Sequence, residues 1–203
     1  MMKVISMLKY PYLSKIIIPF KVYQKSFIRI RKRASISLMS RVVLGSNSEL
    51  PTISRIPINL YFGKDSKTYI GESVSIGPGV SIVVKDKAKL SIGNKCFFTS
   101  NMYIEVLNKL EIGNDVGIAW GVSIIDKNQH NPIYSGLAVN SNDEVKIGNH
   151  VWIGCNVTIL PGTVIGNNSI VAANSVVKGV FKDNCLIGGN PAKIIREDVS
   201  FNW

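Results

Sequence analysis

The sequence predicts an all-β chain whose body is a parallel β-helix of six-residue repeats. From Ile70 onward an aliphatic residue recurs at every sixth position, and glycine usually follows it. The sixes read IGESVS, IGPGVS, IVVKDK; IGNKCF, FTSNMY, IEVLNK; IGNDVG, IAWGVS, IIDKNQ; and IGNHVW, IGCNVT, ILPGTV, IGNNSI, VAANSV, VKGVFK. A period of six is too short for a helical repeat and differs from the two-residue alternation of a half-buried strand.

Three sixes make a coil of three short strands in which one aliphatic side chain per strand points to the axis. Gly, Asn and Pro then occupy the corners, where a positive or fixed φ is needed, and stacked coils bury a continuous aliphatic column. A β-sandwich is the alternative, but its turn signals usually come about every 8–12 residues. We therefore expect the following side chains to point inward: Ile70, Ile76, Ile92, Ile112, Ile118, Ile147, Ile153, Ile159, Ile165 and Val171.

The spacing between triplets of sixes locates the insertions. Successive triplets start 22, 20 and 35 residues apart, whereas Ile147 and Ile165 are 18 apart. Taking one 18-residue coil from each spacing leaves insertions of four, two, seventeen and zero residues, all at the end of a triplet. We expect all of them to leave one edge of the prism. The longest, residues 130–146, is the only long loop that the sequence predicts in the body, and such loops are usually functional.

Charge separates an N-terminal arm from the body. Residues 1–41 carry ten Lys and Arg and no acid, which accounts for +10 of the formal +11; the other residues carry 14 basic and 13 acidic side chains. Pro11 and Pro19 break any long helix, so we expect a partly helical arm. The predicted domains are the arm (1–41), a β-helix domain (42–197) and a short tail (198–203).

Two interpretations of the arm are open. Its aromatic and basic residues suit the surface of an anionic membrane, and its lysines could equally stay in water while the arm packs on the body. No DNA- or RNA-reading motif accompanies the charge, so nucleic acid is not an expected partner. We expect a cytoplasmic protein, because the three cysteines are scattered and no secretory signal or long apolar run is evident. If the arm binds a membrane, we expect it to hold the protein on the inner face of the cytoplasmic membrane.

Residues 147–196 read IGNHVWIGCNVTILPGTVIGNNSIVAANSVVKGVFKDNCLIGGNPAKIIR. This stretch resembles the C-terminal part of the bacterial hexapeptide O-acetyltransferases, such as those that modify maltose, nodulation factor, and capsule or lipopolysaccharide sugars. The resemblance covers about residues 70–197. It implies a left-handed β-helix, a homotrimer, and acetyl-CoA as co-substrate in the cleft between two subunits, with no metal.

A sugar hydroxyl is a poor nucleophile near neutral pH, so a transferase must remove its proton during attack on the thioester. The chain has two histidines. Members of the resembled family carry a pattern like I-x-D-x-D-x-H-P, whose histidine is the base, and Asp126 and His130 match it. Asn128 stands where an acid is common, and Pro132 comes one residue late. The resemblance thus implies that His130 is the base. Without the resemblance, His130 would be interpreted as a solvated loop histidine.

Other catalytic assignments follow with their alternatives. His150 lies in a corner where the family usually has Asp or Asn, so we expect it to be structural. Asp126 either orients the His130 ring or is an ordinary corner residue. Glu105, one coil earlier, is the second candidate for orienting that ring and is also expected to contact the substrate. Asn101 matches an asparagine of the sugar site in maltose-type enzymes, or satisfies its own turn. Trp120 either stacks on a sugar or caps the prism edge.

For the coenzyme, the resemblance implies the following residues: backbone at Gly154 and Ala173, and the side chains of Lys178, Lys193 and Arg196. Cations suit the phosphates of CoA. Maltose-type enzymes have a Thr-Lys pair after SVV, whereas this chain has Lys178-Gly179, which shifts that contact.

We do not expect a zinc carbonic anhydrase, which also occurs on this fold, because two histidines cannot supply a three-histidine zinc site. We do not expect a nucleotidyltransferase–acetyltransferase fusion either, because residues 1–41 are too short for a nucleotidyltransferase domain. The predicted function is acetyl-CoA-dependent O-acetylation of a sugar or glycan acceptor in surface polysaccharide or glycolipid biosynthesis. N-acetylation of an amino sugar and a non-catalytic β-helix scaffold stay open as alternatives.

Overall fold

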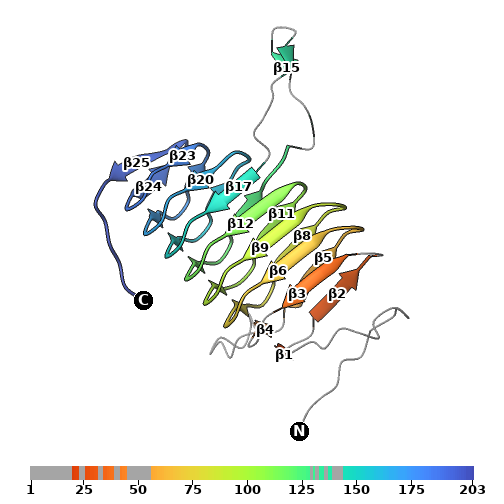
Figure 1. Cartoon of the computed structure of the whole chain (residues 1–203). Coiled ribbons are helices and arrows are strands. Elements are labelled where there is room, and N and C mark those ends of the chain that lie inside the picture. The colour runs from red at the N-terminus through yellow and green to blue at the C-terminus, as the bar shows by residue number, and fades with distance from the viewer. Residues whose placement is uncertain are drawn as a thin grey trace.

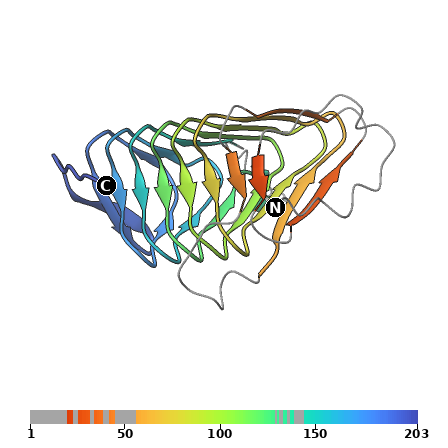
Figure 2. The ribbon, with the colours of Figure 1, turned by 90° about the horizontal axis from the view of Figure 1, so that it is seen from below.

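The chain forms a stack of three-sided coils that follow one another in sequence order (Figure 2). A computed structural model describes residues 20–22, 26–31, 34–38, 42–44, 56–128, 130, 133–134, 137–138 and 144–203. Each coil contributes one short strand to each of three sheets, which we call faces A, B and C (Figure 1).

All neighbouring strands within the three faces pair in parallel except the last pair of face A. Face A consists of β1 (Phe20–Val22), β4 (Val42–Leu44), β7 (Ser75–Ile76), β10 (Phe97–Phe98), β13 (Gly117–Ile118), β18 (Trp152–Ile153), β21 (Ile170–Val171), β24 (Leu186–Gly189) and β25 (Ala192–Arg196). Face B consists of β2 (Ser26–Ile30), β5 (Ile58–Phe62), β8 (Ser81–Val84), β11 (Tyr103–Val106), β14 (Ser123–Ile125), β19 (Thr158–Ile159) and β22 (Val176–Val177). Face C consists of β3 (Ser35–Leu38), β6 (Lys67–Ile70), β9 (Lys89–Ile92), β12 (Lys109–Ile112), β17 (Glu144–Ile147), β20 (Val164–Ile165) and β23 (Val180–Phe181).

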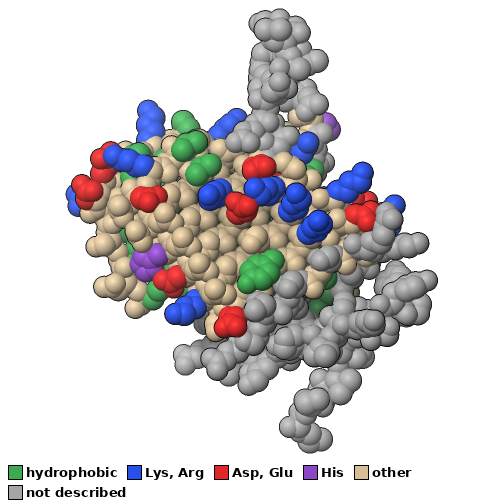
Figure 3. All heavy atoms as spheres, viewed as in Figure 1, with side chains coloured by type: hydrophobic (Ala, Val, Ile, Leu, Met, Phe, Trp, Pro, Cys, Tyr) green, Lys and Arg blue, Asp and Glu red, His purple; other side chains and the backbone are tan. Residues whose placement is uncertain are grey.

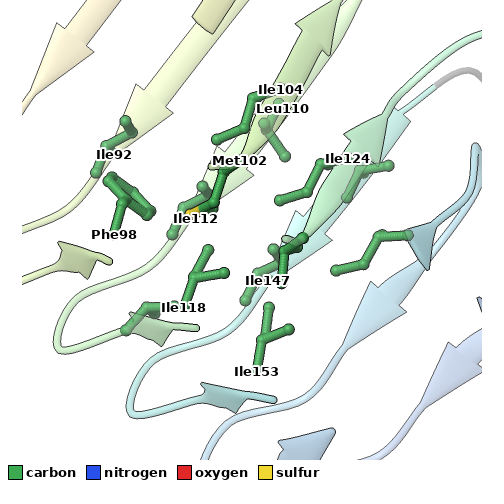
Figure 4. Close-up of a cluster of buried hydrophobic side chains, with 14 of the residues drawn as sticks. Ile92, Phe98, Met102, Ile104, Leu110, Ile112, Ile118, Ile124, Ile147 and Ile153 are labelled. Atoms are coloured by element: carbon green, nitrogen blue, oxygen red, sulfur yellow. The ribbon is translucent and has the colours of Figure 1, made fainter. Parts of the chain in front are cut away.

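An aliphatic column fills the interior of the stack. All ten side chains that the sequence predicts to point inward are at most 3% exposed, so the predicted register is confirmed. Figure 4 shows part of the column, in which Ile92, Ile112 and Ile147 lie in successive coils. A second buried set consists of valines, each two residues before an inward isoleucine: Val74, Val80, Val116, Val122, Val151 and Val157. Burying each such side chain contributes about 1.5–3 kcal/mol, which makes the column the main source of stability.

The IGN triplets make the corners between faces C and A. The side-chain oxygen of Asn149 accepts a 2.8 Å hydrogen bond from the backbone N–H of Asn114, and Asn167 does the same for Asn149. The glycine before each asparagine lets adjacent coils approach. A Cβ at Gly113 would lie only 2.6 Å from the Gly148 carbonyl oxygen. The repeated glycine and asparagine therefore tie each coil to the next.

All the predicted insertions leave the edge between faces B and C, as expected. The longest includes an antiparallel hairpin of β15 (Ile133–Tyr134) and β16 (Leu137–Ala138), which projects beyond the body in Figure 1. Its predicted end at residue 146 is wrong. Glu144 already pairs with Lys109 in face C, because β17 takes up the parallel register of β12 from its first residue.

The described part of the arm, which lies within residues 20–38, forms strands and no helix. β1, β2 and β3 pair in parallel with β4, β5 and β6 and so add their strands to the three faces. Residues 1–19 lie outside the described residues, and the domain boundaries stay a prediction. No helix in the described part of the chain is long and apolar enough to cross a membrane.

Candidate functional site

His130 lies at the root of the long excursion, on the edge between faces B and C. β14 delivers the chain to this edge, and Asp126 to Asn128 lead from the strand to the histidine. The His130 side chain is exposed. An exposed imidazole at the mouth of the excursion is accessible to a ligand.

Asp126 is fully buried and faces the preceding coil. Its two carboxylate oxygens accept hydrogen bonds from the backbone N–H groups of Leu107 and Asn108, at 2.7 and 2.8 Å. Burial raises the pKa of the Asp126 carboxyl, and these N–H donors act against that rise. Both oxygens therefore hold a corner of the β-helix in place. These contacts do not involve His130, so the orientation of the His130 ring by Asp126 stays a prediction.

Glu105 lies on the outer side of face B, beside the strand that leads to His130. It pairs in register with Ile125 of β14 and is only 7% exposed. Lys85 approaches its carboxylate at 3.0 Å, and the hydrogen bond to Glu105 raises the pKa of Lys85. Burial, together with the Glu105 charge, raises the pKa of Tyr103 on the same strand. These residues make a polar, partly water-excluded patch one strand away from the excursion.

The predicted acceptor residues lie at the opposite end of face B. Asn101 and Trp120 are exposed corner residues on successive coils at the edge between faces A and B, and Asn101 has a positive φ of 51°. The segment from Asn101 to Leu107 crosses face B, which at about 3.3 Å per residue is roughly 20 Å. The structure therefore places Glu105 and Asp126 toward the same edge as His130, and Asn101 and Trp120 at the opposite edge.

Three of the predicted coenzyme residues come together at the far end of the stack. Gly154 and Ala173 are so close that a Cβ on Gly154 would lie 2.7 Å from the Ala173 nitrogen. Lys193 of β25 pairs with Gly188, whose neighbour in the sheet is Ala172. Gly154, Ala173 and Gly188 thus form a strip of small residues beside the exposed Lys193, and the Ile195 side chain lies against Gly188. The Lys193 cation suits an anionic ligand.

The other two predicted coenzyme residues lie elsewhere. Lys178 follows β22 at the edge between faces B and C, so the width of face B separates it from Ala173. Arg196 pairs with Leu186 at the other end of the β24–β25 ladder from Lys193. Both side chains are exposed. No group of three or more His, Cys, Asp or Glu among the described residues is arranged to hold a metal ion.

The C-terminal tail forms an aromatic cluster that the sequence analysis missed. The His150 ring stacks on Phe201 with centroids 4.2 Å apart, and Trp203 packs edge-on against Phe97. The Trp203 indole N–H donates to Asp115 Oδ1 at 3.0 Å. A side chain at Gly117 would overlap the Trp203 ring. The aromatic residues at 201 and 203 were the signal in the sequence, but their partners are far away along the chain.

His150 anchors this tail. Its Nδ1 lies 2.6 Å from Asp115 Oδ2, and its Nε2 lies 3.0 Å from the Phe201 carbonyl oxygen. Both partners are acceptors, so both ring nitrogens can donate only in the protonated form. The hydrogen bond to Asp115, followed by the one to Phe201, accordingly raises the pKa of His150. These contacts agree with the structural role expected for His150.

Known proteins resemble the chain in sequence and fold. The bacterial transferase hexapeptide family, as six repeats, matches residues 144–179. WbbJ of Escherichia coli strain K12, named for O-acetyl transfer in lipopolysaccharide biosynthesis, is 33% identical over 147 residues, which are 68% of this chain and 75% of that protein. The galactoside O-acetyltransferase of the same strain is 31% identical over 141 residues, 68% of this chain and 58% of that protein.

A solved structure supports the fold. The crystal structure of the polySia specific acetyltransferase NeuO superposes with a TM-score of 0.54 at 20% identity, covering 91% of this chain and 89% of that chain. At this identity the likeness concerns the fold alone. It confirms the expected left-handed parallel β-helix.

The anchored tail predicts a pH-dependent stability. Because the pKa of His150 is raised in the folded protein, its contribution is complete below the ordinary pKa of about 6.5 and is lost as the pH rises through the raised folded value. His150→Asn suits the positive φ of 52° at this corner and removes the charge. The Tm of the wild type should exceed that of the variant most at acidic pH, with the gap closing on going to alkaline pH. A gap that is the same at all pH values would contradict the assignment.

Proposed function

The chain belongs to the bacterial hexapeptide-repeat acetyltransferases, and from this we propose that it transfers an acetyl group from acetyl-CoA to a sugar hydroxyl in surface polysaccharide or glycolipid biosynthesis. The relatives named above supply the acceptor class, since their names refer to a lipopolysaccharide and a galactoside. The observation that carries the proposal is local. The long break between β14 and β17 has an exposed histidine at its root.

His130 is proposed as the general base. It would accept the proton of the acceptor hydroxyl while the oxygen attacks the thioester carbon. The new C–O bond forms, the C–S bond breaks, and the proton passes from His130 to the departing CoA sulfur. A positioned base contributes about 10²- to 10⁴-fold to such a reaction.

The complete site is proposed to need two subunits of a homotrimer. Asn101 and Trp120 lie across face B from His130, too far away to act on one hydroxyl within a single chain. A neighbouring copy that presents its edge between faces A and B could bring its own Asn101 and Trp120 to this His130. The small-residue strip from Gly154 to Lys193 begins at the same edge, so the coenzyme would be bound by the neighbouring copy.

The arm is proposed to hold the enzyme on the inner face of the cytoplasmic membrane. Ten cations without a neighbouring acid in the sequence support this, and the Arg29 and Arg31 side chains are exposed. Each basic residue at an anionic surface contributes about 1 kcal/mol, and the gain is screened by salt.

His130→Ala should lower kcat for acetyl transfer by about 10²-fold or more and leave the dissociation constant of CoA unchanged, because the base acts in the chemical step. Radiolabelled acetyl-CoA with a panel of sugar acceptors gives the rates. His150→Asn is the matched histidine control and should keep its activity at temperatures below its Tm. An unaltered rate in His130→Ala would rule out the role, and a loss in the control alone would transfer it.

Membrane contact predicts that the protein co-sediments with vesicles containing phosphatidylserine and not with neutral vesicles, and that salt weakens binding. Whole-arm deletion is unsuitable because β1 to β3 belong to the faces. Replacing Lys3, Lys9 and Lys15 by Ser should reduce binding about tenfold or more. The control replaces three body lysines, Lys87, Lys95 and Lys182. Equal sedimentation with both kinds of vesicle, or an unaffected arm variant, would contradict the proposal.

A further inference from the structure

Face C carries a row of lysines. Lys67, Lys89 and Lys109 are the first residues of β6, β9 and β12, and the sheet register places them directly beside one another. All three point away from the aliphatic column, because the next residue of each strand is buried. Neighbouring parallel strands lie about 4.8 Å apart, so the row concentrates positive charge on a short line.

This row costs the fold stability instead of supporting it. Like charges directly opposite each other in a sheet are destabilising. Glu111 and Glu144 compensate Lys109 at 3.0 and 3.4 Å. Lys67 and Lys89 have no acidic partner within the part of the chain that the structure describes. An arrangement that opposes folding and leaves cations exposed suits a ligand of opposite charge.

The row borders a shallow depression on face C, which also contains an aromatic side chain and a hydroxyl group. Figure 3 shows the blue lysine side chains gathered across this face of the body. The outward-facing residues that line the depression are Lys67, Tyr69, Lys89, Ser91, Lys109 and Glu111. Tyr69 is 39% exposed and neighbours Ser91 in the sheet. A phenol ring can stack on the face of a sugar ring, and the serine hydroxyl can exchange hydrogen bonds with it.

The row points toward the proposed catalytic edge. Its last member, Lys109, pairs in register with Glu144, the residue at which the chain returns from the excursion. His130 leaves the body at the other foot of the same excursion. A polymer bound to the lysine row would lie across β6, β9 and β12, and its next residues would reach the foot of the excursion. The proposed coenzyme strip lies on face A and belongs to other strands.

We infer that this lysine row and Tyr69 bind an acidic glycan, the carboxylate-bearing acceptor polymer of the transfer reaction, and lead it toward His130. The inference rests on the proposed function and names its substrate class. A subunit contact is a poorer explanation of the row, since charged residues are depleted from the cores of interfaces. Coulomb attraction would draw the polymer in, and stacking on Tyr69 would favour a sugar over other polyanions.

The test measures binding directly, with polygalacturonate as the acidic glycan and dextran as the neutral one. Full-length protein should bind polygalacturonate, lose affinity as salt rises, and bind dextran at least tenfold more weakly. Replacing Lys67 and Lys89 together by Ser should weaken polygalacturonate binding about tenfold. The control, Lys95→Ser with Lys182→Ser, removes the same net charge elsewhere and should change it less than twofold. Equal affinity for dextran, or equal losses in both double variants, would overturn the inference.

Tyr69→Ala separates a glycan site from a general polyanion site. It should weaken binding of polygalacturonate severalfold and leave binding of polyglutamate unchanged; an unchanged affinity for both polymers would overturn the assignment to a glycan. Because binding is measured without acetyl-CoA, its outcome is independent of catalysis. Acetyl transfer to a small neutral sugar by the wild-type protein tests the proposed function separately.

Discussion

The aliphatic column is the constraint on which the rest of the structure depends. One side chain from each strand must meet the axis, so each coil has three short strands and three corners, and corners of one kind stack into a straight edge. The asparagine side chains at the edge between faces C and A then fix the spacing of the coils through backbone hydrogen bonds. Any residue that interrupts the repeat has to leave through an edge, because the interior has no room for it.

This geometry distributes the chemistry. The insertions that follow β8, β11 and β14 all leave at the edge between faces B and C. His130 lies on this edge, at the end of the lysine row, and β11 carries Glu105 toward the same edge. At the opposite edge of face B lie Asn101, Trp120 and the strip at Gly154, to which substrate binding is proposed. A rigid prism cannot fold these two edges together. The simplest way to complete one site is for a second chain to contribute its edge between faces A and B. The proposed trimer would then be needed for catalysis.

The sequence predicts the repetitive part of the structure well and the long-range contacts poorly. The ten inward positions follow from a period of six, because each depends only on its own coil. The sequence analysis begins the β-helix domain at residue 42 and so misses β1 to β3, since basic residues obscure the period there. Docking of Phe201 and Trp203 joins residues about fifty and more positions away from their partners, and no local pattern encodes it. The contacts of Asp126 with the 107–108 corner also needed the three-dimensional register, because a catalytic and a corner aspartate look the same in sequence.

Complementation between chains tests the central claim, a site assembled from two subunits, most directly. One chain carries His130→Ala and the other carries Asn101→Ala with Trp120→Ala; each is inactive alone if both edges are needed. After joint refolding at equal amounts, an interface pairs an intact His130 with an intact Asn101 and Trp120 in about a quarter of cases, so the mixture should recover about a quarter of the wild-type rate of acetyl transfer. A mixture that is as inactive as its two components, although mixed oligomers form, would contradict the account.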